Sequence, residues 1–387
     1  MLRIILLLGG LTAFPPASTD MYLPAIPLLG TLWDEPLSRI NLALVSFFIA
    51  FSFAILFFGP VSDRFGRKPP LVVGIALYCV GTLLCAAAEG VDAMIAYRSL
   101  QGFGAGSAAA ISVAMAKDRF ADERQRGQVL AYIAMAMAIT PMLAPMIGAA
   151  ILKLATWPYI FYGQAAFGAI MLVATLAMQE TLTQTVDIRL KAVFRRYISL
   201  FSNLPFLMYM FIGSLLMAPM FAFIASSSTI YQTQMQVSAT EYSLLFAFNA
   251  LSLVIGSGVY LQLKKRISDN RVINIAVAIS LIGTVLIFLL DRNASLFHFA
   301  LPMFSVTLSV GISRAPTMNL ALEQVHEHIG QASSLIVFSN FVVAGIAMTI
   351  ASQNVANHIT LIAVIALVAA LAAASILAMN HFSLQRS

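Results

Sequence analysis

Charged side chains are scarce in this sequence, because Asp, Glu, Lys and Arg make up only 10% of its 387 residues. Soluble domains average about 25% charged residues, so this composition excludes an ordinary water-soluble protein. Cysteine is almost absent, and its two copies, Cys79 and Cys85, lie in one apolar segment. Their placement offers neither a disulfide framework nor metal-binding spacing. Segments of about ten residues with alternating polarity are also missing, which excludes a membrane β-barrel.

Hydrophobic residues dominate instead, at 60% of the chain. They form apolar runs long enough to cross a bilayer, for which a helix needs about 20 residues. The sequence therefore predicts an all-α polytopic membrane protein with twelve transmembrane helices. The expected helices are 3–32, 39–62, 70–88, 92–115, 127–152, 157–179, 204–232, 239–262, 271–290, 295–321, 330–353 and 358–380.

Basic residues are unevenly distributed over the links between these helices. One alternating set of links, together with the two chain ends, holds 17 of the 22 Lys and Arg residues, whereas the other set holds only Arg39, Lys153 and Arg292. The positive-inside rule assigns the richer set to the cytoplasm. We therefore expect both termini in the cytoplasm, and we attribute the net charge of +6 to membrane topology rather than to nucleic-acid binding.

The longest polar link follows the sixth expected helix. It divides the chain into two six-helix halves, 1–180 and 204–387, joined by a cytoplasmic linker at 181–203. Within the linker, residues 188–201 intersperse apolar side chains with basic ones. This pattern is typical of a short helix that lies in the membrane interface.

One carboxylate, Asp20, lies about midway along the first apolar run. A charged group at such a depth costs roughly 3 kcal/mol and marks an ion or proton pathway by default. Prolines at positions 15, 16, 24 and 27 are expected to loosen the helix around it, which membrane helices tolerate where the backbone lines a cavity. The alternative, a carboxylate that caps a short helix in a soluble core, fits the composition poorly.

The link between the second and third helices reads GPVSDRFGRK over residues 59–68. It resembles the hallmark loop of the major facilitator superfamily, G-x-x-x-D-R-x-G-R-K/R. The resemblance implies the twelve-helix fold of that family and a gating role for Asp63, Arg64 and Arg67, through charge pairing with neighbouring helix ends. The alternative is a basic loop that only sets topology. A shift of 199 positions along the sequence aligns Arg67 with Arg266, which indicates a diverged internal repeat.

The fourth helix carries Arg98, Gln101 and Gly102 in the spacing R-x-x-Q-G. An arginine inside a membrane needs a partner or a water-filled cavity, because it does not lose its charge. The spacing resembles a motif of drug/proton antiporters in the same superfamily, which implies that Arg98 takes part in proton coupling. The alternative is an arginine that snorkels to the periplasmic surface.

The fifth helix contains Pro145 and Gly148 within TPMLAPMIGA, residues 140–149. This stretch resembles the antiporter signature that ends G-P-x-x-G-G, with alanine in place of the outer glycines. The resemblance implies a hinge, and the alternative is a proline-kinked packing helix; both can hold together.

The first expected helix resembles a particular branch of the same superfamily. Its stretch TDMYLPAIP, residues 19–27, is similar to the T-D-M-Y-L-P-A-x-P of the Bcr/CflA-type multidrug exporters, and the similarity extends along the chain. It implies that Asp20 carries the coupling proton. Some related exporters have a second acid about two turns earlier, where this chain has Thr12.

Several polar and adaptable side chains are candidates for the substrate cavity. They are Tyr22, Gln101, Tyr132, Met135, Met142, Asn249 and Asn340. Arg314, inside the tenth helix, is a candidate for gating the cytoplasmic mouth or binding an anionic substrate, with a snorkelling arginine as the alternative.

These features favour a proton-coupled exporter of small, mostly apolar drugs that works by alternating access in the bacterial inner membrane. We expect it to act as a monomer in the lipid bilayer, with the proton as coupling ion, without a metal or other cofactor and without a nucleic-acid partner. The first rival is a transporter of one metabolite, such as a nucleoside, amino acid or sugar derivative. A membrane enzyme, a receptor or a channel ranks lower, because no clustered catalytic set, large soluble domain or filter-like repeat is visible.

Overall fold

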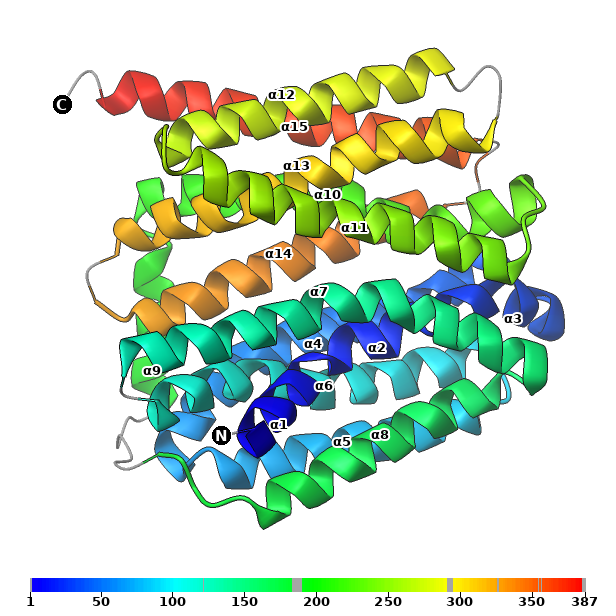
Figure 1. The fold of residues 1–387 in the computed structure, drawn as a ribbon, viewed down its shortest axis with the longest axis horizontal. Coiled ribbons are helices and arrows are strands. Elements are labelled where there is room, and N and C mark those ends of the chain that lie inside the picture. Colours follow the sequence, from blue (N-terminus) through cyan, green and yellow to red (C-terminus); the bar gives the residue numbers. More distant parts are fainter. Residues whose placement is uncertain are drawn as a thin grey trace. The chain divides into compact units, whose positions relative to one another are not determined.

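The computed structural model describes residues 2–120, 122–182, 190–290, 295–325, 327–353, 355 and 357–384. Within these residues every regular element is a helix (Figure 1). Ten helices are long and apolar enough to cross a membrane, and a bent pair, Ile4–Thr12 with Phe14–Leu32, adds an eleventh span. The one expected helix outside this set is the fourth, which is present as α6, Val91–Arg119, and whose 29 residues include Arg98 and Gln101. The predicted all-α polytopic membrane fold is thereby confirmed.

The remaining helices match the expected spans closely. Their bounds are α4 Leu37–Phe65, α5 Lys68–Ala86, α7 Glu123–Leu154, α8 Pro158–Ala177, α10 Leu204–Ser228, α11 Ala239–Leu263, α12 Asp269–Leu290, α13 Leu296–Glu323, α14 Ile329–Ala351 and α15 His358–Leu384. A single π-helical turn, η2 Thr229–Gln234, extends α10.

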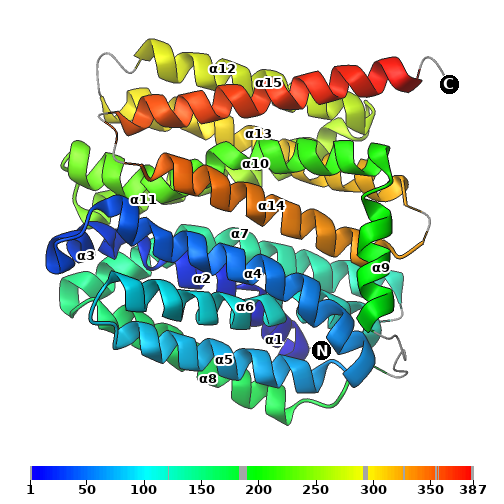
Figure 2. The ribbon, with the colours of Figure 1, turned by 180° about the vertical axis from the view of Figure 1, so that it is seen from behind.

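The chain divides into two compact units. Met1–Glu35 and Leu42–Arg195 form the first, here called the N-terminal unit, whereas Pro36–Asn41 and Arg196–Ser387 form the C-terminal unit. In the N-terminal unit α5 packs against α6 and α8, and both views show α5 and α8 side by side (Figures 1 and 2). In the C-terminal unit α10 packs against α13, α14 and α15, and α12 packs against α13 and α15.

The two units repeat the same local pattern at corresponding positions. The helix before the basic loop ends at Phe65 in the N-terminal unit and at Leu263 in the C-terminal unit, one position away from the shift of 199 that aligns the two loops. The second helix of the C-terminal pair begins at Asp269, close to the counterpart of Lys68. The architecture is therefore consistent with an internal repeat.

Several helix starts in this chain are capped by side chains. Ser238 and Glu241 form a capping box at the start of α11, and Asn203 accepts a hydrogen bond from the N–H of Phe206 at the start of α10. Such caps satisfy backbone donors that have no partner inside the helix.

The linker helix α9 spans Leu190–Leu200, inside the expected range 188–201. Residues 183–189 lie outside the described part, so the start of the expected helix does too. Ile198 and the following Phe201 are exposed, whereas Val193, Tyr197 and Leu200 are buried. An exposed apolar edge on a short helix is consistent with a position in the membrane interface.

The first expected helix is broken into four pieces. They are α1 Leu2–Thr12, α2 Phe14–Asp20, the 3₁₀ turn η1 Leu23–Ala25, and α3 Ile26–Trp33. Prolines occupy the first turns of α2, η1 and α3, where a missing N–H costs no helical hydrogen bond. The axis bends by 42° between α1 and the pieces that follow, which confirms that the prolines interrupt this helix.

Candidate functional site

Asp20 lies at the C-terminal end of α2, directly before the break in the first span. Its side chain is buried, and the Thr19 hydroxyl lies 2.8 Å from Asp20 Oδ1, in position to donate a hydrogen bond. Arg98 is its electrostatic neighbour. No ion pair within 4 Å joins the two among the described residues, so the carboxyl group and the guanidinium are close without a direct contact.

The break supplies an unusual acceptor, the backbone carbonyl of Ser18. In a continuous α-helix the N–H of Tyr22 would donate to this oxygen. Here the N–H of Tyr22 donates instead to the carbonyl of Thr19, at 3.2 Å. The Ser18 carbonyl is thus free to accept a hydrogen bond from another helix.

Arg98 on α6 uses that acceptor. Its Nη1 donates to the Ser18 carbonyl at 2.9 Å and to Oε1 of Gln101 one turn later on α6. The side chain is fully buried, which rules out the alternative that Arg98 snorkels to the surface. A buried guanidinium keeps its charge, so these contacts and the rings described next must compensate it.

Two aromatic rings cover the guanidinium. The Arg98 Cζ atom lies 4.6 Å from the ring centroid of Phe47 and 5.2 Å from that of Tyr22. Cation–π contacts of this kind strengthen when they are desolvated. Tyr22, a predicted cavity residue, is itself fully buried and packs against Phe161. In this structure it contacts Arg98, and its role toward a substrate stays a prediction.

Gln101 connects Arg98 to two further helices. Its Nε2 donates to Oγ1 of Thr82 on α5 at 2.8 Å and to Oε1 of Gln164 on α8 at 2.9 Å. Gln164 Nε2 in turn lies 3.4 Å from the carbonyl oxygens of both Ala17 and Ser18. Gln101 is fully buried, so the predicted cavity residue serves here as the hub of a hydrogen-bond network.

Gln164 and the Ser18 carbonyl were not among the residues that the motifs indicated. A signal for Gln164 was present, because it is the one amide side chain in the interior of the expected helix 157–179, whose last residue is Gln179. A polar residue in a membrane span usually faces the bundle interior and finds a partner there.

The motif glycines bring these helices together. A Cβ atom on Gly102 would lie 2.2 Å from the carbonyl oxygen of Phe47, and one on Gly148 would lie 2.1 Å from that of Met21. Both distances are far shorter than a carbon–oxygen contact allows, so only glycine lets α6 and α7 approach so closely. Gly148 thereby packs α7 directly against the residue that follows Asp20, next to the buried Pro145.

The predicted gating loop holds a second charge cluster. Arg67 is buried, and its Nε donates to Oδ2 of Asp118 on α6 at 2.6 Å. Its Nη1 donates to Asp63 on α4 and, at 2.8 Å, to the hydroxyl of Ser62. Arg67 thus joins the ends of α4 and α6, and the gating role of this loop stays a prediction. Arg64 stacks on the ring of Phe65, 5.3 Å from its centroid.

The same loop also joins α5 to α8, because a side chain at each of these two helix ends binds backbone groups of the other. Lys68 Nζ donates to the carbonyls of Leu176 and Met178 at 2.7 and 2.8 Å, where α8 ends. Gly66 has φ +89°, and a Cβ atom there would lie 2.6 Å from an oxygen of Glu180. The loop therefore needs glycine both for its backbone conformation and for this close approach.

Glu180 completes the cap from the other side. Its carboxylate accepts hydrogen bonds from the backbone N–H groups of Arg67, Lys68, Thr181 and Leu182 at 2.8–3.0 Å. Partial burial alone would raise the pKa of Glu180, but these four N–H donors prevail and hold the pKa below its ordinary value. The loop, α5 and α8 are thus held together by Lys68 and Glu180.

In the C-terminal unit the predicted asparagines join helices. Asn249 is buried on α11, where its Oδ1 accepts from the hydroxyl of Thr307 on α13 at 2.9 Å. Asn340 on α14 is half-buried, and its Oδ1 accepts from the hydroxyl of Ser214 on α10 at 2.9 Å. Arg314 on α13 is exposed, and its side chain has no hydrogen bond or ion pair within the described part of the chain.

The remaining cavity candidates lie along α7. Tyr132 and Met135 are about half exposed, at 49% and 52%, and Met142 is half-buried. Their side chains are accessible, and their role as lining residues stays a prediction.

Comparison with known proteins agrees with this geometry. The family model described as Major Facilitator Superfamily matches residues 8–348. An uncharacterized MFS-type transporter, YdgK of Bacillus subtilis, is 29% identical over 87% of this chain and 85% of its own length. A bicyclomycin resistance protein homolog of Haemophilus influenzae is 29% identical over 88% and 87%. Multidrug resistance protein MdtL of Shewanella oneidensis is 26% identical over 87% and 85%.

Among solved structures, a D-xylose–proton symporter is similar with a TM-score of 0.77 and 15% identity over 96% of both chains. At that identity the likeness concerns the fold alone. The chain belongs to the major facilitator superfamily and is a multi-pass membrane transporter. The names of its relatives support the multidrug-exporter branch that the motifs resemble.

Proposed function

We propose that this chain exports small lipophilic drugs across the bacterial inner membrane in exchange for protons. Asp20 carries the coupling proton, and Arg98 modulates it. The loop around Arg67 gates the cytoplasmic side, both termini lie in the cytoplasm, and the protein acts as a monomer. The relatives named for bicyclomycin resistance and multidrug resistance support the substrate class.

One observation carries this proposal. Asp20 is a buried carboxyl group at a break in a membrane span, with Arg98 nearby but not paired with it. A buried carboxyl group binds a proton more readily in dry surroundings and releases it more readily as a cation approaches. A modest change in the helix break is therefore enough to load or empty Asp20 without a contact between proton and drug.

The exchange follows from competition between proton and drug for alternative states of one transporter. Rocking of the two halves would expose the site to either side of the membrane in turn. With Asp20 as the single deep carboxyl group among the described residues, export of a neutral compound for one proton would be driven by both the pH gradient and the membrane potential.

The test is transport in proteoliposomes with an imposed pH gradient. An acidic lumen should drive uptake of bicyclomycin by the wild type, and Asp20→Asn should abolish the dependence on the gradient. Asp34→Asn is the matched control, because Asp34 is an exposed acid at the end of the same span. Its left-handed backbone, with φ 52°, suits asparagine as well. Full gradient-driven uptake by Asp20→Asn would overturn the assignment.

Arg314 favours a second candidate function, the transport of one anionic metabolite. An exposed arginine without a partner in the described residues is suited to bind a carboxylate or phosphate. A resistance panel in a host that lacks its own exporters separates the two functions. Resistance to several unrelated drugs supports the exporter, whereas no resistance together with uptake of a single anionic nucleotide or sugar derivative supports the metabolite transporter.

A further inference from the structure

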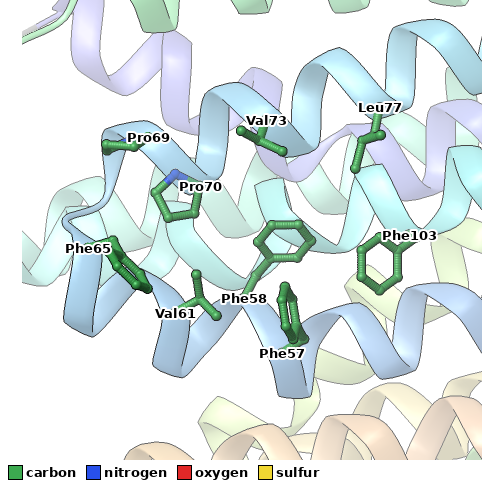
Figure 3. Close-up of a pocket in the computed structure, with 9 residues that line it drawn as sticks. All are labelled: Phe57, Phe58, Val61, Phe65, Pro69, Pro70, Val73, Leu77 and Phe103. Atoms are coloured by element: carbon green, nitrogen blue, oxygen red, sulfur yellow. The ribbon is translucent and has the colours of Figure 1, made fainter. Parts of the chain in front are cut away.

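An apolar groove lies between α4 and α5 of the N-terminal unit, and none of its residues belongs to the network around Asp20. Its volume is about 350 Å³. Side chains of α4 and α5 point toward each other across it, and Phe103 of α6 lies at the end near Leu77 (Figure 3). The lining residues are Phe57, Phe58, Val61, Phe65, Pro69, Pro70, Val73, Leu77 and Phe103.

The groove has a buried aromatic floor and an exposed rim. The rings of Phe57, Phe58 and Phe103 contact one another with centroids 5.3–5.9 Å apart, and Phe58 is buried. At the rim Phe57 is 49% and Val73 56% exposed. Both helices are long and apolar enough to span a membrane, so lipid is the expected surrounding of an apolar rim along them.

The end of the groove near the gating loop lacks free backbone donors. A helix start normally presents four N–H groups without helical partners. At the start of α5 the N–H groups of Arg67 and Lys68 both donate to Glu180 at 3.0 Å. The next two residues, Pro69 and Pro70, have no N–H. The apolar surface therefore continues up to the level of the loop without an unsatisfied polar group.

A positive charge lies at this same end. Phe65 lines the groove, and the Arg64 guanidinium carbon lies 5.3 Å from the Phe65 ring centroid. The basic loop at 59–68 is one of the parts of this unit that the positive-inside rule assigns to the level of the cytoplasmic lipid headgroups. Anionic headgroups concentrate around basic residues at this level.

We propose that the groove binds one acyl chain of an anionic phospholipid of the cytoplasmic leaflet, with the phosphate beside Arg64. The lining offers no polar group that would select a drug, since binding sites for drugs combine an apolar wall with a few placed polar groups. A chain gains little hydrophobic energy by leaving bulk lipid. Van der Waals fit and the headgroup charge therefore hold it, and one basic residue should favour an anionic over a zwitterionic lipid about fivefold.

Photo-crosslinking in proteoliposomes tests this site. The probe is phosphatidylglycerol with a diazirine in the middle of one acyl chain, added in trace amounts to phosphatidylcholine vesicles that contain the full-length protein. Adducts are mapped by peptide mass spectrometry after illumination. We expect Phe57 and Val73 to be labelled several-fold more than Ile170 and Val173, which are exposed apolar residues of α8 in the same unit. Equal labelling of both pairs would overturn the proposal.

Two variants separate the chain from the headgroup. Val73→Trp fills the groove and should lower labelling at Phe57 several-fold, whereas Val173→Trp should leave it unchanged. Arg64→Gln should remove the roughly fivefold preference for the phosphatidylglycerol probe over a phosphatidylcholine probe with the same chain. Equal labelling by both probes in the wild type refutes the anionic headgroup, and a Val73→Trp variant that keeps full labelling at Phe57 refutes the groove as its site.

Discussion

The hydrogen-bond network around Arg98 contains two glutamines, and replacing them should lower the free energy of unfolding by unequal amounts. Gln101 makes three hydrogen bonds, one of them with the charged guanidinium, whereas Gln164 makes one bond at 2.9 Å and two long ones at 3.4 Å. Methionine has a similar unbranched shape without the amide. We therefore compare Gln101→Met with Gln164→Met.

Interhelical hydrogen bonds in membrane proteins contribute about 0.6 kcal/mol on average, and bonds to a charged group are roughly twice as strong as neutral ones. Gln101→Met should therefore lower the free energy of unfolding by about 2 kcal/mol and Gln164→Met by about 1 kcal/mol. Thr82 is not left without a partner, because its hydroxyl also lies 2.6 Å from the carbonyl of Tyr78. The double variant should cost about 0.6 kcal/mol less than the two single variants together, since both remove one shared bond.

Unfolding by sodium dodecyl sulfate in mixed micelles measures these differences. The two tryptophans of the chain, Trp33 and Trp157, pack edge to face at 5.6 Å and lie in the N-terminal unit, so their fluorescence reports on the unit that holds the network. Gln128→Met is the control, because Gln128 is exposed on α7 of the same unit. The reasoning fails if Gln164→Met costs more than Gln101→Met, or if the two losses are fully additive.

Three further outcomes are expected in the same assay. Gly148→Ala should destabilise by about 1–3 kcal/mol through overpacking against the carbonyl of Met21, whereas Gly127→Ala, on the same helix with open space around it, should be neutral or slightly stabilising; equal effects would contradict the close approach. The pKa of Glu180 is lowered in the folded protein, so its stabilising contribution is complete above the ordinary pKa of 4.5 and is lost as the pH falls below it. Glu180→Gln should therefore reduce the loss of stability at acidic pH, and an unchanged loss would refute this. Arg314→Ala should change stability by less than about 0.5 kcal/mol while it reduces transport of any anionic substrate, and a large stability loss would show that Arg314 has a structural role instead.

Most of the fold, and about half of the hydrogen-bond network around Arg98, could be predicted from the sequence. Apolar runs located the helices, and the prolines around Asp20 located the break, because both effects are local. The spacing R-x-x-Q-G correctly placed Arg98 and Gln101 on one face of α6. The sequence could not show that Arg98 donates to a backbone carbonyl, since a carbonyl has no residue signature and becomes available only where a helix is interrupted.

The contacts of Glu180 and Gln164 were missed for a related reason. Each joins segments more than 60 positions apart in the chain, and such pairings depend on how helices pack rather than on any local pattern. Glu180 lies in a polar link, where an acid is unremarkable in sequence. Only the geometry of α5 and α8 reveals that it caps the helix start next to the gating loop.

The break in the first span and the burial of Arg98 depend on each other. If residues 18–22 were a regular helix, the N–H of Tyr22 would compete with Arg98 and Gln164 for the Ser18 carbonyl, and this would weaken a buried contact that offsets the charge of Arg98. The close approach of α7 at Gly148 holds Met21, within the same break, so α7 can act on this exchange of acceptors. Any straightening of the break would then weaken the bond of Arg98 to this carbonyl and favour the neighbouring carboxylate of Asp20 as an alternative acceptor. The proton affinity of Asp20 would change in the same step, so the coupling proposed above would follow from a backbone rearrangement alone.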